Sequence, residues 1–368
     1  MPKVDYYSTP EVHPSFKLNG VAYSNEELRI ISLSLCENGE VYEQEAGHFL
    51  KNWLDDKPYI EAQTSGSTGV PKTLKLYKEQ MIHSALATGK FFKTLADSTA
   101  LLCLSSNYIA GKMMLVRAMV LGWRLDIVPY RSNPLDTLYK RYDFCAMVPL
   151  QLDNSLNRLH LIKKLIVGGG SVSEKLQKLV QTIDTKVYET YGMTETVSHI
   201  AARRLNPKKK KAGIKAFKAL PEIVLATDDR NCLVIKAPKL TPEVLVTNDV
   251  VELLTYKKFN WKGRYDHVIN SGGIKLHPEV IEKKIQQYIS QRFFLIGTAD
   301  DLLGERLTLI IEGQEVSEEV RNSLLQSLSK DEQFSKFEIP KSLYFLPKFI
   351  ETPTGKIQRN ATLKLANL

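Results

Sequence analysis

Thr64-Ser65-Gly66-Ser67-Thr68-Gly69-Val70-Pro71-Lys72 is the stretch around which the rest of the chain is organised. Strand-like segments flank it, at residues 59–62 and 73–76. Glycines let backbone N–H groups converge on an anion, and hydroxyl side chains add further donors. The pattern differs from the Walker loop, because the lysine does not follow the second glycine and no helix begins there. The stretch therefore indicates either an anion-binding loop or a polar hairpin turn.

Length and composition indicate a soluble protein with more than one structural unit. The chain has 368 residues, of which 43% are hydrophobic and 25% charged. That length exceeds one core of ordinary size, whereas the composition is that of a globular protein. We find no apolar run long enough to span a membrane and no signal peptide at the N-terminus. Cys36, Cys103, Cys145 and Cys232 are scattered without metal or redox spacing, so we expect a cytoplasmic protein.

The net charge of +9 indicates anionic partners. Part of it comes from the run Lys208-Lys209-Lys210-Lys211, which is typical of a solvated loop. No aromatic residues interleave with this run and no nucleic-acid-binding motif is present, so we expect no nucleic-acid partner. Small polyanions such as nucleotides explain the charge equally well.

Strand-like and helix-like segments alternate along the first two thirds of the chain. This alternation predicts an α/β fold with a mostly parallel sheet covered by helices on both faces. In such sheets ligands gather at the carboxyl ends of the strands. The expected helices span residues 26–35, 41–54, 78–92, 111–121 and 174–181, and the expected strands span residues 100–104, 124–128, 144–148, 165–167 and 186–189.

Three loops at predicted strand ends carry groups suited to a nucleotide. Gly168-Gly169-Gly170 permits close approach of a ligand or forms a tight turn, and Ser171 and Glu174 have capping-box spacing for the next helix. In Thr190-Tyr191-Gly192-Met193-Thr194-Glu195-Thr196, the aromatic ring could stack on a base, Thr194 could bind a phosphate and Glu195 could hold Mg²⁺. Asp249 ends the segment of residues 244–249 and comes after its apolar strand, where a carboxylate can accept two hydrogen bonds from a ribose. The alternative for each loop is a polar turn without a ligand.

The composition changes near Gly263, and the remainder indicates a small α+β unit. Pro278 is expected as the first residue of a helix that continues over residues 279–289. Strands over residues 293–297 and 307–312 and a helix over residues 318–328 should follow.

Five of these segments, taken together, resemble the adenylate-forming superfamily of acyl-CoA synthetases, peptide-synthetase adenylation domains and luciferase. They occur in the order typical of that superfamily and extend from residue 64 to residue 359. The segments are TSGSTGVPK, YGMTET, VTND, GRYDHVINSGGIKLHPEVIE and PTGKIQR. VTND departs from the usual tyrosine/threonine-Gly-Asp pattern but keeps the aspartate.

The resemblance implies two domains and a two-step reaction. Residues 1–263 would form the AMP-binding domain, and residues 264–368 a small mobile domain that swings about a hinge at Asp266. Because the superfamily carries a long region before the glycine loop, we expect part of that region to be missing from this chain. A carboxylic acid and ATP would form an acyl-adenylate and pyrophosphate with Mg²⁺, and the thiol of coenzyme A would then displace AMP. Its partners would be a small-molecule carboxylic acid, ATP and coenzyme A, and a homodimer is left open.

The resemblance also assigns roles by position. Lys356, Thr194 and Glu195 would be catalytic, with Glu195 as the Mg²⁺ ligand, and Lys356 would neutralise charge on the α-phosphate. Ser271, Gly272 and Gly273 would line the path of coenzyme A. The predicted ATP- or AMP-binding residues are Thr64, Ser65, Gly66, Ser67, Thr68, Gly69, Lys72, Gly169, Gly170, Tyr191, Gly192, Met193, Thr194, Asp249 and Arg264.

Within the superfamily the chain looks most like the short o-succinylbenzoate–CoA ligases of menaquinone biosynthesis. That substrate keeps a second carboxylate, so its pocket needs a cation. Our candidate is Lys112, with Arg117 behind it, although a lysine on a helix is more often simply exposed. Asn107, Gly168 and His199 are further candidates for the acyl pocket. A ligase for another aryl or acyl acid, an enzyme that loads a carrier protein, and an inactive nucleotide-binding relative remain as alternatives.

Overall fold

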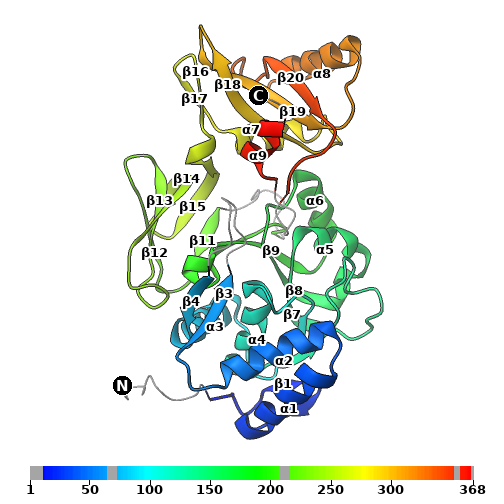
Figure 1. Ribbon diagram of the computed structural model, residues 1–368, viewed down its shortest axis with the longest axis vertical. Coiled ribbons are helices and arrows are strands. Elements are labelled where there is room, and N and C mark those ends of the chain that lie inside the picture. The colour runs from blue at the N-terminus through cyan, green and yellow to red at the C-terminus, as the bar shows by residue number, and fades with distance from the viewer. Residues whose placement is uncertain (1–10, 64–72, 208–215, 352–356, 366–368) are drawn as a thin grey trace.

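The computed structural model describes residues 11–63, 73–207, 216–351 and 357–365, and the structural statements below concern these residues. Figure 1 shows an elongated molecule, with the N-terminal helices at one end of its long axis and the C-terminal sheet at the other. The glycine-rich loop (residues 64–72), the lysine run and Lys356 lie outside the described residues, so their predicted roles stay predictions.

The first two helices are α1 (Asn25–Asn38) and α2 (Val41–Trp53). A capping box fixes the start of α1: Ser24 N donates to the Glu27 carboxylate at 2.8 Å, and Glu27 N donates to Ser24 Oγ at 3.3 Å. The helices pack closely at Gly47, where an added Cβ would lie 2.8 Å from the Ser32 carbonyl oxygen. Only glycine allows this approach.

A 13-stranded sheet is the main element of the structure, in the order β12-β13-β14-β15-β11-β10-β9-β8-β7-β5-β6-β1-β2. Six neighbouring strands, from β9 to β1, are parallel. Parallel strands need a crossover connection, which is usually a helix, because each strand must start from the same end of the sheet. These strands are β1 (Lys17–Leu18), β5 (Thr99–Leu102), β6 (Arg124–Ile127), β7 (Tyr142–Met147), β8 (Ile162–Val167) and β9 (Lys186–Gly192). After α1 and α2, the further helices before β9 are α3 (Lys78–Phe92), α4 (Ile109–Leu121), α5 (Pro149–Asn154) and α6 (Glu174–Leu179).

The other strands of this sheet pair antiparallel, and short connections join several of them. They are β2 (Val21–Ala22), β10 (His199–Arg204), β11 (Phe217–Ala219), β12 (Val224–Thr227), β13 (Cys232–Lys236), β14 (Leu245–Thr255) and β15 (Lys258–Arg264). A separate hairpin, β3 (Tyr59–Gln63) with β4 (Thr73–Tyr77), pairs Gln63 with Thr73 on either side of the glycine-rich loop.

The chain leaves the large sheet after Arg264 and enters a second sheet at Ile269, passing through a 3₁₀ turn, η5 (Tyr265–His267). The second sheet has five strands in the order β17-β16-β19-β18, with β20 paired to β19. Its strands are β16 (Ile269–Ser271), β17 (Ile274–Leu276), β18 (Phe293–Asp300), β19 (Gly304–Glu312) and β20 (Ser342–Leu346). Its helices are α7 (Pro278–Ile285), α8 (Glu318–Lys330) and α9 (Arg359–Leu365).

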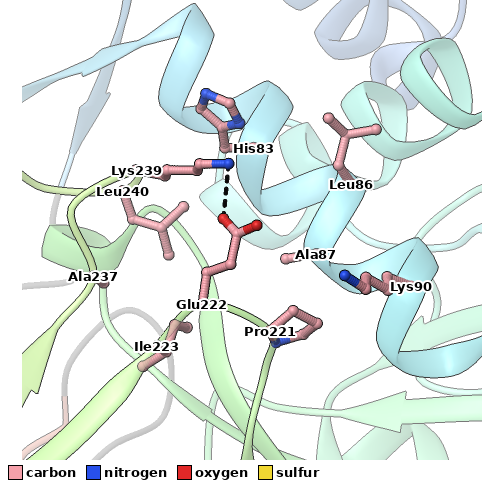
Figure 2. Close-up of a pocket in the computed structure, with 10 residues that line it drawn as sticks. All are labelled: His83, Leu86, Ala87, Lys90, Pro221, Glu222, Ile223, Ala237, Lys239 and Leu240. Carbon is pink, nitrogen blue, oxygen red and sulfur yellow. Dashed lines mark ion pairs between the residues drawn. The ribbon is translucent and has the colours of Figure 1, made fainter. Parts of the chain in front are cut away.

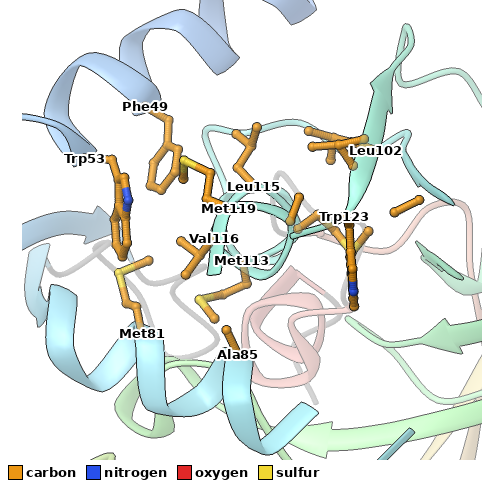
Figure 3. Close-up of a cluster of buried hydrophobic side chains, with 14 of the residues drawn as sticks. Phe49, Trp53, Met81, Ala85, Leu102, Met113, Leu115, Val116, Met119 and Trp123 are labelled. Atoms are coloured by element: carbon orange, nitrogen blue, oxygen red, sulfur yellow. The ribbon is translucent and has the colours of Figure 1, made fainter. Parts of the chain in front are cut away.

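The largest hydrophobic core lies where α2, α3 and α4 meet the parallel strands. Figure 3 shows Trp53 of α2 and Met81 of α3 directed towards Met113 and Val116 of α4. Helix α4 is apolar on nearly all sides because it is buried between the sheet and these helices. It is therefore a rigid support for any polar side chain that it carries.

The α/β class predicted from the sequence is confirmed. Parallel pairing occupies about half of the large sheet and also joins β19 to β20 in the second sheet. Helix α3 has the predicted bounds, whereas α7 ends at Ile285 rather than at residue 289. The predicted cap at Ser171 is wrong: Ser173 is the N-cap of α6, and its Oγ accepts from Leu176 N at 3.2 Å. None of the helices in the described residues is long and apolar enough to cross a membrane.

Candidate functional site

The loops predicted to bind a ligand follow the carboxyl ends of neighbouring parallel strands. Gly168 comes directly after β8, and Gly192 is the last residue of β9, which pairs with β8. A Cβ added at Gly168 would lie 2.7 Å from Thr190 Oγ1, which donates to Val167 O at 3.0 Å. Gly169 has φ +81°, a conformation that favours glycine. The glycines therefore have a structural role in this turn, and their predicted ligand contact stays a prediction.

Tyr191 and Asp249 form the centre of the candidate site. Tyr191 belongs to β9 rather than to a loop, and its hydroxyl donates to Asp249 Oδ2 at 2.6 Å. Burial, followed by the charge of Asp249, raises the pKa of Tyr191 well above its usual value. The Tyr191 ring packs edge-on against Phe259, with 5.2 Å between ring centroids. A neutral, fixed tyrosine thus orients the carboxylate that the sequence predicts to bind ribose.

Arg264 lies beside the same carboxylate, at the point where the chain leaves the large sheet. It pairs with Asp249 in the β14–β15 register, and its guanidinium lies 4.0 Å from Asp249 Oδ1. The guanidinium donates to Asp266 at 3.0 Å, and both Asp266 and Arg264 remain partly exposed. The structure thus brings Tyr191, Asp249 and Arg264 together, with the predicted hinge residue next to them. Their predicted contacts with a nucleotide stay predictions.

Thr194 and Glu195 lie in a 3₁₀ turn, η3 (Thr194–Thr196), directly after β9. Thr196 stabilises this turn, since its Oγ1 accepts from Met193 N at 3.1 Å. The Glu195 side chain is exposed, and no cluster of three or more His, Cys, Asp or Glu residues suited to a metal occurs in the described residues. One exposed carboxylate fits Mg²⁺, which commonly takes one or two carboxylates together with substrate phosphates. Glu195 is therefore suited to hold Mg²⁺ only with a bound nucleotide.

Arg117 forms a buried polar cluster with Ser198 and His199. The Arg117 side chain, on α4, is 2% exposed and donates to Ser198 Oγ at 2.7 Å. The same nitrogen lies 3.3 Å from His199 Nδ1. No carboxylate forms an ion pair with Arg117 among the described residues, and its Nε and His199 Nε2 have no hydrogen-bond partner there. A buried guanidinium without a counter-ion is costly, so Arg117 is a candidate for pairing with an anionic group.

Lys112, the first cation chosen from the sequence, lies on the first turn of α4. Its Nζ donates to the backbone oxygens of Ser106 at 2.7 Å and Asn107 at 2.8 Å. Burial lowers the pKa of Lys112 to about 8, against an opposite effect of Glu45. The Lys112 amine therefore stabilises the segment before α4. In contrast, Nε of Arg117 has no hydrogen-bond partner among the described residues. The sequence offered a signal for Arg117, an arginine within an apolar helix, but none for Ser198.

Ser271, Gly272 and Gly273 form the tip of the β16–β17 hairpin. Ser271 pairs with Ile274, and the two glycines between them have φ +57° and +80°. Positive φ at both central positions is the signature of a type I′ hairpin turn, which accounts for the glycines structurally. Their predicted place on the path of coenzyme A stays a prediction.

Arg359 is the described residue of the last predicted motif. Its guanidinium donates to Glu282 at 2.9 Å and to Leu295 O at 3.1 Å. Arg359 thereby fixes the start of α9 to α7 and β18, three residues after Lys356 in the sequence.

A hollow lies apart from these residues, between α3 and the segments that flank β12 and β13 (Figure 2). Its volume is about 140 Å³, and an ion pair between Lys239 and Glu222, at 2.9 Å, lies at its edge. Among the predicted site residues that the structure describes, none lines it.

Comparison with known proteins gives a family match over more than half of the chain. Residues 34–237 match the model of the family described as AMP-binding enzyme. Among curated proteins, the 2-succinylbenzoate–CoA ligase of Listeria monocytogenes serovar 1/2a is 24% identical over 336 residues, which cover 84% of this chain and 71% of that protein. The protein of the same name from Haemophilus influenzae is 24% identical over 337 residues, 85% of this chain and 70% of that protein.

Solved structures show the same fold. An acyl-CoA synthetase (AMP-forming)/AMP-acid ligase II-like protein from Dyadobacter fermentans is 35% identical with a TM-score of 0.59, over 90% of this chain and 97% of that one. The o-succinylbenzoate CoA synthetase of Bacillus subtilis in complex with its acyl-adenylate intermediate is 17% identical with a TM-score of 0.71. That match covers 92% of this chain and 80% of the other.

Proposed function

This chain belongs to the AMP-binding enzyme family, and we propose that it is an ATP-dependent acid–thiol ligase that converts o-succinylbenzoate into its coenzyme A thioester. The family supports the general reaction, in which an acid is activated as an adenylate. The curated relatives named 2-succinylbenzoate–CoA ligase support the choice of acid. The place in menaquinone biosynthesis is part of our proposal and rests on that choice of acid.

The observation that carries the choice of acid is the unpaired cation of Arg117. The first carboxylate of the substrate must reach the α-phosphate of ATP, so a buried guanidinium elsewhere in the pocket suits a second carboxylate. Ser198 fixes the guanidinium from one side through a 2.7 Å hydrogen bond. Burial, and then the charge of Arg117, lower the pKa of His199 well below its usual value. A neutral His199 adds no competing charge beside Arg117.

In the first half-reaction, a carboxylate oxygen of the acid attacks the α-phosphorus of ATP, and the bond to the bridging oxygen of pyrophosphate breaks. Thr194 is suited to hold the α-phosphate, and the Asp249 carboxylate is suited to accept hydrogen bonds from the ribose. Mg²⁺, with Glu195 as a ligand, would neutralise phosphate charge. Lys356 would stabilise the negative charge that develops on the α-phosphate without transferring a proton.

In the second half-reaction, the thiolate of coenzyme A attacks the acyl carbon and AMP leaves. We propose that the C-terminal unit turns about Asp266 between the two steps, so that Lys356 withdraws and the hairpin at Ser271–Gly273 approaches the thiol. Asp266 is suited to this role because it lies in η5, between the two sheets.

A screen of carboxylic acids tests this proposal. Purified protein would be incubated with ATP, Mg²⁺, coenzyme A and one acid, and thioester and AMP would be quantified by mass spectrometry. We expect o-succinylbenzoate to react faster than benzoate and 4-phenylbutyrate, which lack the second carboxylate. Preference for a monocarboxylic acid would favour a ligase for another aryl or acyl acid. Absence of AMP formation with every acid would favour an inactive relative.

A further inference from the structure

A β-bulge in β15 sets the direction of Trp261. Val250 pairs with Gly263, whereas the next residue of β14, Val251, pairs with Trp261, so Lys262 is the extra residue. Without this extra residue, alternation along the strand would direct Trp261 to the opposite face of the sheet. The bulge therefore places Trp261 on the same face as Asp249.

Glycine makes this bulge possible. Gly263 has φ +144° and is buried under Glu279 of α7, whose Oε2 would lie 2.3 Å from an added Cβ. Lys262 points to the other face, where it pairs with Glu252 at 2.9 Å.

The indole of Trp261 holds the oxygen of Asp249 that Tyr191 leaves free. Trp261 Nε1 donates to Asp249 Oδ1 at 3.1 Å, while Tyr191 donates to Oδ2 at 2.6 Å. The Asp249 side chain is 12% exposed, so it retains access to solvent. A carboxylate has about four lone-pair sites, so these two donors leave acceptor capacity on both oxygens for two hydroxyl groups of a ligand. The two protein donors fix the plane of the carboxylate before a ligand arrives.

Helix α7 covers the indole from the side of the C-terminal unit. Lys283 Nζ lies 5.3 Å from the Trp261 ring centroid, within the range of a cation–π contact. Lys283 is partly buried, and burial, followed by the charge of Arg203 on the large sheet, lowers its pKa. Trp261 thus has one polar contact to the large sheet and one to the C-terminal unit.

We infer that Trp261 is a positioning residue of the ribose site: its indole N–H orients the Asp249 carboxylate, and Lys283 of α7 holds the ring in place. This inference deepens the proposed function and rests on it, since the ligand is the ribose of ATP, of the adenylate and of AMP. The geometry links the position of α7 to the orientation of the ribose-binding carboxylate.

Calorimetric titration of the full chain with AMP tests the inference, with 2′,3′-dideoxyadenosine monophosphate as the matched ligand. Trp261→Phe keeps an aromatic ring for Lys283 to contact but removes the indole N–H that donates to Asp249. We expect about tenfold weaker AMP binding, because hydrogen bonds to charged groups are among the stronger ones. Lys283→Met removes the cation alone, with about threefold loss expected. Lys262→Gln, on the same bulge but the opposite face, serves as the control and should bind AMP as the wild type does.

The dideoxy ligand separates a positioning role from a structural one. It lacks the two hydroxyl groups, so Trp261→Phe should change its affinity less than twofold. Equal losses for both ligands, or an unchanged affinity of Trp261→Phe for AMP, would overturn the inference. A wild-type protein that does not bind AMP would instead overturn the proposed function.

Tryptophan emission gives a second readout that needs no variant. The chain has three tryptophans, and the other two, Trp53 and Trp123, are buried in the α2–α4 core. Saturating AMP should change the wild-type emission, because the ribose hydroxyls engage the carboxylate that Trp261 contacts, and the dideoxy ligand should leave it nearly unchanged. Equal emission changes with both ligands would overturn the inference, even if Trp261→Phe failed to fold.

Discussion

Replacement of Arg117 by methionine should stabilise the free protein and impair its activity. Arg117 is 2% exposed and has no acidic partner among the described residues. An unpaired buried charge costs several kcal/mol, and the hydrogen bond to Ser198 returns about 1.5–3 kcal/mol of that. Methionine fills most of the same volume without a charge. We therefore expect the free energy of unfolding of Arg117→Met to rise by about 1–2 kcal/mol.

The activity should change in the opposite direction. Truncating one partner of a buried charge pair costs about 2–5 kcal/mol, which corresponds to a roughly 30- to 4,000-fold lower kcat/KM for the dicarboxylic substrate. The KM for ATP should remain within about threefold of the wild-type value, because Arg117 has no recorded contact with those predicted nucleotide-binding residues that the structure describes.

Urea unfolding followed by circular dichroism, in a buffer without phosphate or carboxylate, measures the stability change. Arg203→Met is the matched control, because Arg203 forms an ion pair with Glu189 at 2.6 Å. Its loss leaves a buried carboxylate unpaired, so we expect a destabilisation of about 3 kcal/mol. If Arg117→Met were destabilised like Arg203→Met, or kept full activity with the dicarboxylic acid, Arg117 would be a structural residue and our reasoning would fail.

Three further predictions follow from the site. Lys356→Ala should abolish pyrophosphate release but spare coenzyme A transfer from preformed acyl-adenylate, and equal loss of both steps in a stopped assay would contradict its electrostatic role. Burial and the charge of Arg117 lower the pKa of His199 in the folded protein. Below the unfolded pKa of about 6.5, only the unfolded chain therefore takes up the proton, and the free energy of unfolding falls by about 1.4 kcal/mol for each pH unit by which the pH is lowered. Urea unfolding at pH 7.5 and 5.5 should show a smaller decrease in His199→Gln, and an identical decrease would contradict this account. Lys112→Ala should lower the thermal midpoint because the segment before α4 loses two hydrogen bonds; an unchanged midpoint with a raised KM for the dicarboxylic acid would restore Lys112 as the substrate cation.

Local sequence patterns predicted most elements, because the forces behind them act over a few residues. The apolar spacing of residues 78–92 and the hydrophobic run near residue 165 specify a helix and a buried strand without reference to the rest of the fold. The cap of α6 was misplaced by two residues, since Ser171 and Ser173 are equally suitable in sequence and only the path of the chain selects one. The strand character of Tyr191 was missed because its pairing partners on β10 lie later in the chain.

The sequence alone determined the family-like order of the motifs, including the glycine-rich loop, Tyr191, Asp249 and Arg264. Each of these motifs is short and contiguous, so it can be recognised without a fold. Only the tertiary structure decided that Arg117 rather than Lys112 is the unpaired cation, and that Trp261 holds Asp249. Arg117 and Ser198 are 81 positions apart, and the direction of Trp261 depends on one extra residue in β15. The order and register of the strands bring residues that are distant in sequence together. Neither can be read from a local sequence pattern.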